Sequence, residues 1–121
     1  MFSKTKNEVV SLKGKKEIEL LFAEGKHFGK APLKLVCASG TDALALGFGV
    51  SKRNFPKAVD RNRIKRLMRE QFKLQRANAD YIIFYGKGFF IYTGNVVPSL
   101  YDLEKPMYEL IGRWCSLEEA S

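Results

Sequence analysis

Residues 51–76, SKRNFPKAVDRNRIKRLMREQFKLQR, combine a helical pattern with the net charge of the whole chain. Ten lysines and arginines stand against two acids, Asp60 and Glu70, so this stretch carries a net charge of +8. The complete chain of 121 residues also carries +8, so the residues outside the stretch sum to zero. Positive charge gathered in one segment indicates a surface for a polyanion.

The stretch predicts a helix over about residues 57–75, with Asn54 as a candidate cap and Pro56 near the first turn. At about 100° per residue, its basic side falls within an arc of roughly 140°; this basic arc contains Arg61, Asn62, Lys65, Arg66, Arg69, Lys73 and Arg76. The apolar residues lie on another side and are Ile64, Leu67, Met68 and Leu74, with Phe72 at the boundary. Like charges recur at one-turn intervals, which destabilises an isolated helix but suits a surface that faces phosphates.

Other patterns predict a mixed helix and strand fold. Ile18, Leu21 and Phe22 have helical spacing, which predicts a helix over residues 15–24 with Gly25 as its C′ residue. Alternation predicts strands over residues 33–38 and 43–51. In the second strand, large residues at even positions face a core, and the small residues opposite them admit a closely packed surface or mark a bulge.

The second half of the chain predicts one more strand and one more helix. Residues 81–85, YIIFY, read as a buried central strand, and residues 86–98 as a long connection or a short extra strand. Ser99 can cap a last helix in which Pro106 predicts a kink or a late start. The apolar stripe of that helix is Leu103, Met107, Leu110, Ile111 and Trp114. A single domain over residues 1–121 is expected, with residues 1–11 loose and residues 116–121 a polar tail.

Composition narrows the class of function. The 45% hydrophobic content supports a modest core. No apolar run reaches the length of a membrane span, and the N-terminus lacks the pattern of a signal peptide, so a cytoplasmic location is expected. Cys37 and Cys115 read as packing thiols. The single histidine, His27, and the absence of carboxylate clusters or a phosphate loop predict no catalytic and no metal-ligating residue in the protein.

The string AVDRNRIKRLMRE at residues 58–70 resembles the Arg-Asn-Arg helix of the bacterial ribonuclease P protein component. GFGVSKR at residues 47–53 is similar to the strand and turn that precede this helix in the family. LLFAEG at residues 20–25 and DYIIF at residues 80–84 also stand in the family's order. The resemblance covers about residues 12–114.

The resemblance implies an α+β fold of helix, three strands, helix, strand and helix, with a four-stranded sheet and a left-handed βαβ crossover. It implies a role in the maturation of precursor tRNA 5′ ends, in which a catalytic RNA carries out the chemistry with Mg²⁺ that the RNA mainly binds. Residues expected to face that RNA are Lys52, Arg53, Lys57, Arg61, Asn62, Arg63, Lys65, Arg66, Arg69 and Lys73. A cleft for the single-stranded 5′ leader is expected at Ile18, Phe22, Lys34, Val36 and Ser51.

The sequence departs from the family inside that cleft, because the family often has aromatics where this chain has Ile18 and Val36. Stacking on an aromatic ring contributes about 1–3 kcal/mol per base. Weaker or differently placed leader contacts are therefore expected. Two alternatives fit the same basic helix: a structural RNA-binding protein of the ribosomal kind, without a catalytic assembly, and a DNA-binding regulator.

Overall fold

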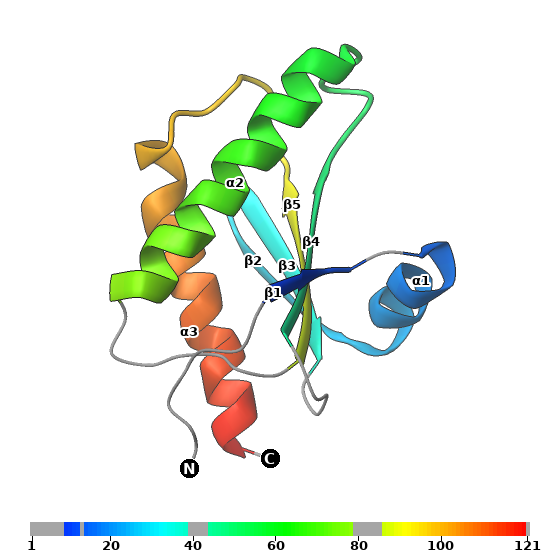
Figure 1. Ribbon diagram of the computed structural model, residues 1–121, viewed down its shortest axis with the longest axis vertical. Coiled ribbons are helices and arrows are strands. Elements are labelled where there is room, and N and C mark those ends of the chain that lie inside the picture. The colour runs from blue at the N-terminus through cyan, green and yellow to red at the C-terminus, as the bar shows by residue number, and fades with distance from the viewer. Residues whose placement is uncertain (1–8, 13, 39–43, 79–85, 121) are drawn as a thin grey trace.

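A computed structural model describes residues 9–12, 14–38, 44–78 and 86–120 (Figure 1). Within them the chain forms five strands, three α-helices and one 3-10 turn. In chain order these are β1 (Val9–Ser11), α1 (Lys15–Glu24), β2 (Lys26–Lys30), β3 (Leu33–Ala38), β4 (Leu44–Val50), α2 (Ala58–Asn78), β5 (Gly86–Tyr92), η1 (Tyr101–Leu103) and α3 (Glu104–Ala120). Among the described helices, none combines the length and hydrophobicity that a membrane-spanning segment requires.

The strands form one mixed sheet in the order β1-β4-β5-β3-β2. β4 pairs in parallel with both β1 and β5, whereas β3 pairs antiparallel with β2 and β5. The predicted α+β order of helix, three strands, helix, strand and helix is confirmed. The sheet has five strands rather than four, because β1 adds to the free edge of β4. The hand of the β4–α2–β5 crossover stays a prediction.

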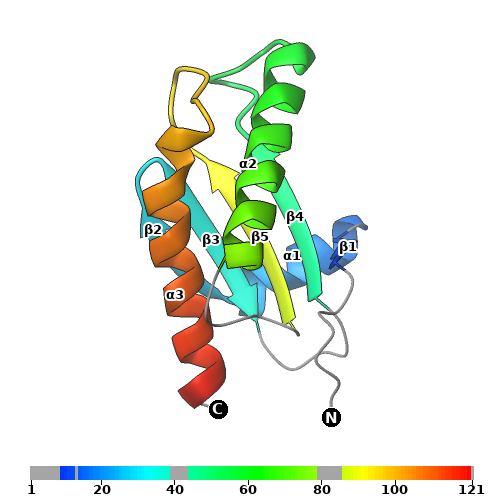
Figure 2. The same ribbon diagram turned by 60° about the vertical axis from the view of Figure 1, so that its left-hand side comes forward.

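The sheet separates two unequal layers (Figures 1 and 2). α2 and α3 cover one face, over a core that includes Leu35, Leu44 and Phe90. α1 covers part of the other face, where Leu21 packs with Val36. Alternation along β3 explains the division, because odd positions such as Leu35 point to one face and Val36 to the other.

The N-terminal half follows the sequence predictions with two corrections. α1 has the predicted bounds, but Gly25 has an extended backbone (φ −78°, ψ 172°) and not the left-handed one of a C′ residue. Its smallness matters because a Cβ there would lie 2.6 Å from the carbonyl oxygen of Leu21. The expectation that residues 1–11 are loose is wrong for β1, which pairs with β4. Residues 1–8 lie outside the described part.

β5 is a central strand of the sheet, and it lies in the stretch for which the sequence left open a connection or a short extra strand. The predicted strand at residues 81–85 lies outside the described residues. The glycines of β5 made this strand hard to predict from the sequence, because glycine is uncommon inside strands. Gly88 is present for packing: a Cβ there would lie 2.4 Å from the Trp114 ring of α3.

α3 confirms the late start predicted from Pro106, which lies in its first turn. Before it, the Oγ atom of Ser99 accepts from the Asp102 amide (3.0 Å), and the Asp102 carboxylate accepts from the Ser99 amide (2.9 Å). This reciprocal pair satisfies two donors at the start of the helical segment. The predicted apolar stripe is buried throughout. Residues 116–120, expected as a polar tail, continue the helix.

Replacing Gly88 by alanine should destabilise the fold, because the new methyl group overlaps the indole of Trp114. We expect Gly88→Ala to lower the free energy of unfolding by about 1–3 kcal/mol in urea titrations. Gly112→Ala is the matched control: a Cβ at Gly112, within α3, meets nothing within 4 Å. That control should stabilise the protein by up to about 1 kcal/mol. Equal effects of the two substitutions would contradict the packing described for Trp114.

Candidate nucleic-acid interface

α2 has a buried side and a basic side, as the sequence predicts. Ile64, Met68 and Phe72 are buried in the main core. The other side carries the polar side chains of the site. The exposed ones are Asn62, Arg66, Arg69 and Lys73, and the half-buried ones are Arg61, Lys65 and Arg76. The prediction that Leu74 belongs to the packed side is wrong, since its side chain is 41% exposed.

Arg63 is exposed but stands apart from the basic arc. Helical geometry places it on the side of α2 that carries Leu67 and Glu70, four and seven residues further on. Asp60 lies in the first turn of α2, where a negative charge interacts favourably with the helix dipole. Burial lowers the pKa of Arg76 from its ordinary value; an arginine nevertheless keeps its charge at neutral pH.

Arg61 is tied to the turn that precedes α2. Its Nη1 atom donates to the carbonyl oxygens of Phe55 and Pro56, each at 2.8 Å. The guanidinium therefore holds the turn against the helix, a role that the sequence analysis missed. Hydrogen bonds from a charged donor contribute about 1.5–3 kcal/mol. An arginine in the first turn of the helix, six residues after a buried aromatic, is the only signal for this contact, and it is a weak one.

The same turn presents further positive charge. The Oγ atom of Ser51 accepts from the amides of Arg53 (3.1 Å) and Asn54 (3.4 Å). Phe55 is buried and anchors the turn, with its ring centroid 6.0 Å from that of Tyr92. Lys52, Arg53 and Lys57 are exposed beside the start of α2. The turn thus extends the basic arc from the helix to the end of β4.

Asn54 does not cap α2, so this prediction is wrong. Its Nδ2 atom donates to the carbonyl oxygen of Gly94 at 3.2 Å, which links the turn to the segment after β5. α2 begins at Ala58, and the amide of Arg61 donates to the carbonyl oxygen of Lys57. Lys57 therefore occupies the N-cap position, and the backbone around it is held by Arg61.

Arg69 sets the position of the basic arc relative to the sheet. Its guanidinium carbon lies 5.3 Å from the centroid of the Phe48 ring, within the range of a cation–π interaction. Phe48 belongs to β4, and its ring stacks on Phe90 of β5. The basic arc consequently borders β4 at Phe48.

The second candidate surface is a hollow beside α1, on the opposite face of the sheet from α2. Its volume is about 370 Å³, and Phe22, Lys34, Val36 and Ile91 are among the residues that line it. The structure thus brings together three of the five residues predicted for the leader cleft. Ile18 packs nearby against the same small core but does not line the hollow. Ser51 lies beyond the end of β4, one residue after the last pair of the β4–β5 ladder.

The aromatic rings of Phe22, His27 and Phe28 line this hollow, and Phe89 adjoins it through its contact with the Phe22 ring. The Phe22 and Phe89 rings meet edge to face, with centroids 5.4 Å apart. The His27 ring lies 6.3 Å from that of Phe22, and its Nε2 atom is 2.9 Å from the carbonyl oxygen of Phe22. An exposed lysine, Lys34, stands beside them. Rings beside a cation are the features that bind single-stranded nucleic acid.

Phe89 was missed by the sequence analysis. It pairs with Val36 across the β3–β5 ladder, so an aromatic stands beside the position where the family's aromatic is lacking. The small residues of β4 make room for it: a Cβ at Gly47 or Gly49 would lie 2.5 or 2.8 Å from the Phe89 ring. The predicted close approach to the small face of β4 is confirmed, and the approaching surface is this ring.

The residues that the structure describes include no group of three His, Cys, Asp or Glu side chains placed to hold a metal ion. Arginine, lysine and aromatic side chains dominate both surfaces. This chemistry suits binding of a polyanion.

Comparison with known proteins agrees with this geometry. A family model described as Ribonuclease P matches residues 7–94. A ribonuclease P protein component of Porphyromonas gingivalis is 38% identical over 79 residues, which are 62% of this chain and 56% of that relative. A ribonuclease P protein component of Chromohalobacter salexigens is 47% identical over 53 residues, which are 44% of this chain and 41% of that relative. The chain thus spans about half the length of the curated relatives it matches.

Two solved structures share the fold. The RNase P protein of Staphylococcus aureus has a TM-score of 0.72 at 19% identity, covering 87% of this chain and 94% of its own. The RNase P protein of Thermotoga maritima has a TM-score of 0.71 at 23% identity, covering 85% and 96%. Because the family model matches well over half of the sequence, the chain belongs to the ribonuclease P protein family.

Proposed function

We propose that this chain is the protein subunit of a ribonuclease P ribonucleoprotein in the cytoplasm. The observation that carries the proposal is the basic arc of α2, with exposed Arg66, Arg69 and Lys73, in a chain that belongs to this family. In this proposal the basic arc and the turn before it bind the catalytic RNA. The hollow beside α1 holds the 5′ leader of precursor tRNA.

The chemistry of the two surfaces supports the assignment of one to the catalytic RNA and the other to the leader. A helix face with arginines and lysines at one-turn spacing suits a phosphate backbone, because each guanidinium can donate two parallel hydrogen bonds. The hollow is lined by the rings of Phe22, His27 and Phe28, which suits unpaired bases. The protein supplies binding and orientation, and the catalytic RNA with its Mg²⁺ supplies the chemistry of phosphodiester hydrolysis.

Reconstitution tests the proposal directly. The protein is added to a bacterial ribonuclease P RNA with a precursor tRNA at a Mg²⁺ concentration too low for efficient cleavage by the RNA alone. We expect the rate of correct 5′ cleavage to rise at least about tenfold, equivalent to lowering the activation free energy by about 1.4 kcal/mol. Unchanged cleavage, together with retained binding to structured RNA, would instead favour a structural RNA-binding protein.

The basic arc makes a prediction about salt dependence. Arg66→Ala and Arg69→Ala should each reduce the slope of log K against log salt for the catalytic RNA by about one. Arg113→Ala is the control, since this exposed arginine belongs to α3 and lies over the Phe28 ring. Arg61→Ala should in addition lower the free energy of unfolding by about 1–3 kcal/mol, because Phe55 and Pro56 lose their donor. A slope equal to that of the unaltered protein in both Arg66→Ala and Arg69→Ala would exclude contact between the arc and the RNA.

The hollow makes a separate prediction about the leader. Lys34→Ala removes an exposed cation at little cost to folding, and it should weaken binding of precursor tRNA by about threefold to tenfold. Binding of leaderless tRNA to the same assembly should not change. Lys26→Ala is the matched control, because alternation along β2 directs that side chain to the face that bears α3. Equal losses for tRNA with and without a leader would remove Lys34 from the leader site.

A further inference from the structure

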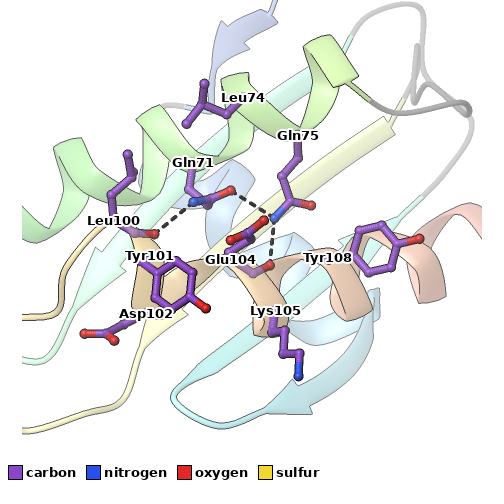
Figure 3. A pocket seen from close by; sticks show the side chains of 9 residues that line it. All are labelled: Gln71, Leu74, Gln75, Leu100, Tyr101, Asp102, Glu104, Lys105 and Tyr108. Carbon is purple, nitrogen blue, oxygen red and sulfur yellow. Dashed lines mark hydrogen bonds between the residues drawn. The ribbon is translucent and has the colours of Figure 1, made fainter.

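The side of α2 that faces α3 is a poor surface for RNA (Figure 3). A hollow of about 1050 Å³ lies there, and Gln71 and Leu74 line it about 150° around the helix from the middle of the basic arc. Its lining carries two acids, Asp102 and Glu104, against one lysine, Lys105. A net-negative surface does not attract a phosphate backbone, so the contacts of α2 with RNA depend on how the side chains of the basic arc are held.

No carboxylate holds Arg69 of the basic arc in the described part of the chain. Arg69 is exposed, and its neighbours one helical turn away are the cations Lys65 and Lys73. The ion pairs of the described residues lie elsewhere, between β2 and α3 and between β5 and α1. An arginine side chain has many rotamers, so the guanidinium would lack a defined position unless another group held it.

An aromatic ring stands beside Arg69 where a carboxylate could have stood. The guanidinium carbon lies 5.3 Å from the centroid of the Phe48 ring, within the range of a cation–π interaction. The Phe48 ring stacks on the fully buried ring of Phe90, with centroids 5.9 Å apart and planes at 12°. Phe90 in turn contacts Phe72 of α2, at 6.0 Å between centroids. The main core therefore sets the position of the ring beside Arg69.

A ring can position a guanidinium without neutralising it. A carboxylate partner would cancel the positive charge and accept the N–H donors that a phosphate group needs. The Phe48 ring offers only its electron-rich face, so the charge and the five N–H donors of Arg69 stay available to a ligand. Arg61 differs, because its Nη1 atom already donates to two backbone carbonyl oxygens.

We propose that Phe48 is a positioning residue for RNA binding: it holds the Arg69 guanidinium ready for the phosphate backbone of the catalytic RNA and does not itself contact that RNA. This role rests on the proposed function, in which the basic arc binds the catalytic RNA. A side chain that is already ordered loses less conformational entropy on binding, so affinity rises without an additional contact. Phe48 therefore contributes to affinity only through Arg69.

A double-mutant cycle on the catalytic RNA tests this dependence. Phe48→Leu should raise the dissociation constant by about twofold to fivefold, because it removes the cation–π contact. In the Arg69→Ala background, Phe48→Leu should have no further effect, because the side chain that it positions is gone. The slope of log K against log salt should fall by about one in Arg69→Ala and stay unchanged in Phe48→Leu, which removes no charge.

Two further variants separate positioning from packing. Val50→Ala is the matched control, because Val50 lies on the same face of β4 and packs against the same core as Phe48. It should leave the affinity for RNA unchanged. Fluorination of the Phe48 ring keeps its shape and draws electron density from its face, so it should weaken RNA binding as Phe48→Leu does. A purely structural role of Phe48 would be insensitive to fluorination.

Nuclear magnetic resonance of the full chain without RNA tests the contact itself. The order parameter of the Arg69 Nε–H bond should fall in Phe48→Leu and not in Val50→Ala. An unchanged order parameter in Phe48→Leu, or a loss of affinity that persists in the Arg69→Ala background, would overturn the positioning role alone. An Arg69→Ala variant that binds the catalytic RNA as tightly as the unaltered protein would overturn the assignment of the basic arc to that RNA, and the positioning role with it.

Discussion

Close packing of aromatic rings against glycines in β4 and β5 is the contact on which both layers of the structure depend. The Phe89 ring lies over Gly47 and Gly49 on one face, and the Trp114 ring lies over Gly88 on the other. A larger residue at Gly88 would push the Trp114 ring, and with it α3, away from the sheet. A larger residue at Gly47 or Gly49 would displace the Phe89 ring of β5, which packs against Phe22 of α1. The space beside each of these glycines is thus filled by an aromatic ring from another strand or helix, which packs both faces of β4 and β5 closely.

Packing in the core in turn offsets the mutual repulsion of the positive charges on α2. Like charges at one-turn intervals oppose helix formation in isolation, but Ile64 and Met68 fix the helix on the sheet by full burial. Arg61 and Arg69 are also held, one by two backbone carbonyl oxygens and one by the Phe48 ring. The basic arc is therefore a fixed array of charges, and the free energy that maintains it comes from the other side of the helix.

The extent to which sequence predicted this structure varied with the kind of residue. Periodicity was sufficient for α1, β3, β4 and the buried stripe of α3, because there the side chains themselves determine which face is buried. Periodicity failed at β5, because its glycines argue against a strand unless the aromatic rings that cover them are known. The basic arc was predictable from spacing alone, yet the two bonds of Arg61 were not, because they depend on the path of the preceding turn. Phe89 was missed for a related reason: its relation to Val36 is one of register between strands distant in sequence.

The position of Ser51 at the end of β4 has a consequence for how two ligands would meet. Through Phe48, β4 borders the basic arc on one face of the sheet. The hollow beside α1 is lined by β3 and by Ile91 of β5, and Ile91 pairs with Gly49, two residues before Ser51. Under the proposed function, a catalytic RNA and a precursor tRNA would be held by the same rigid sheet. Each raises the effective concentration of the other near the protein, without any contact between their two binding surfaces. Such an arrangement favours substrates long enough to reach both sites and gives no advantage to those that reach only one.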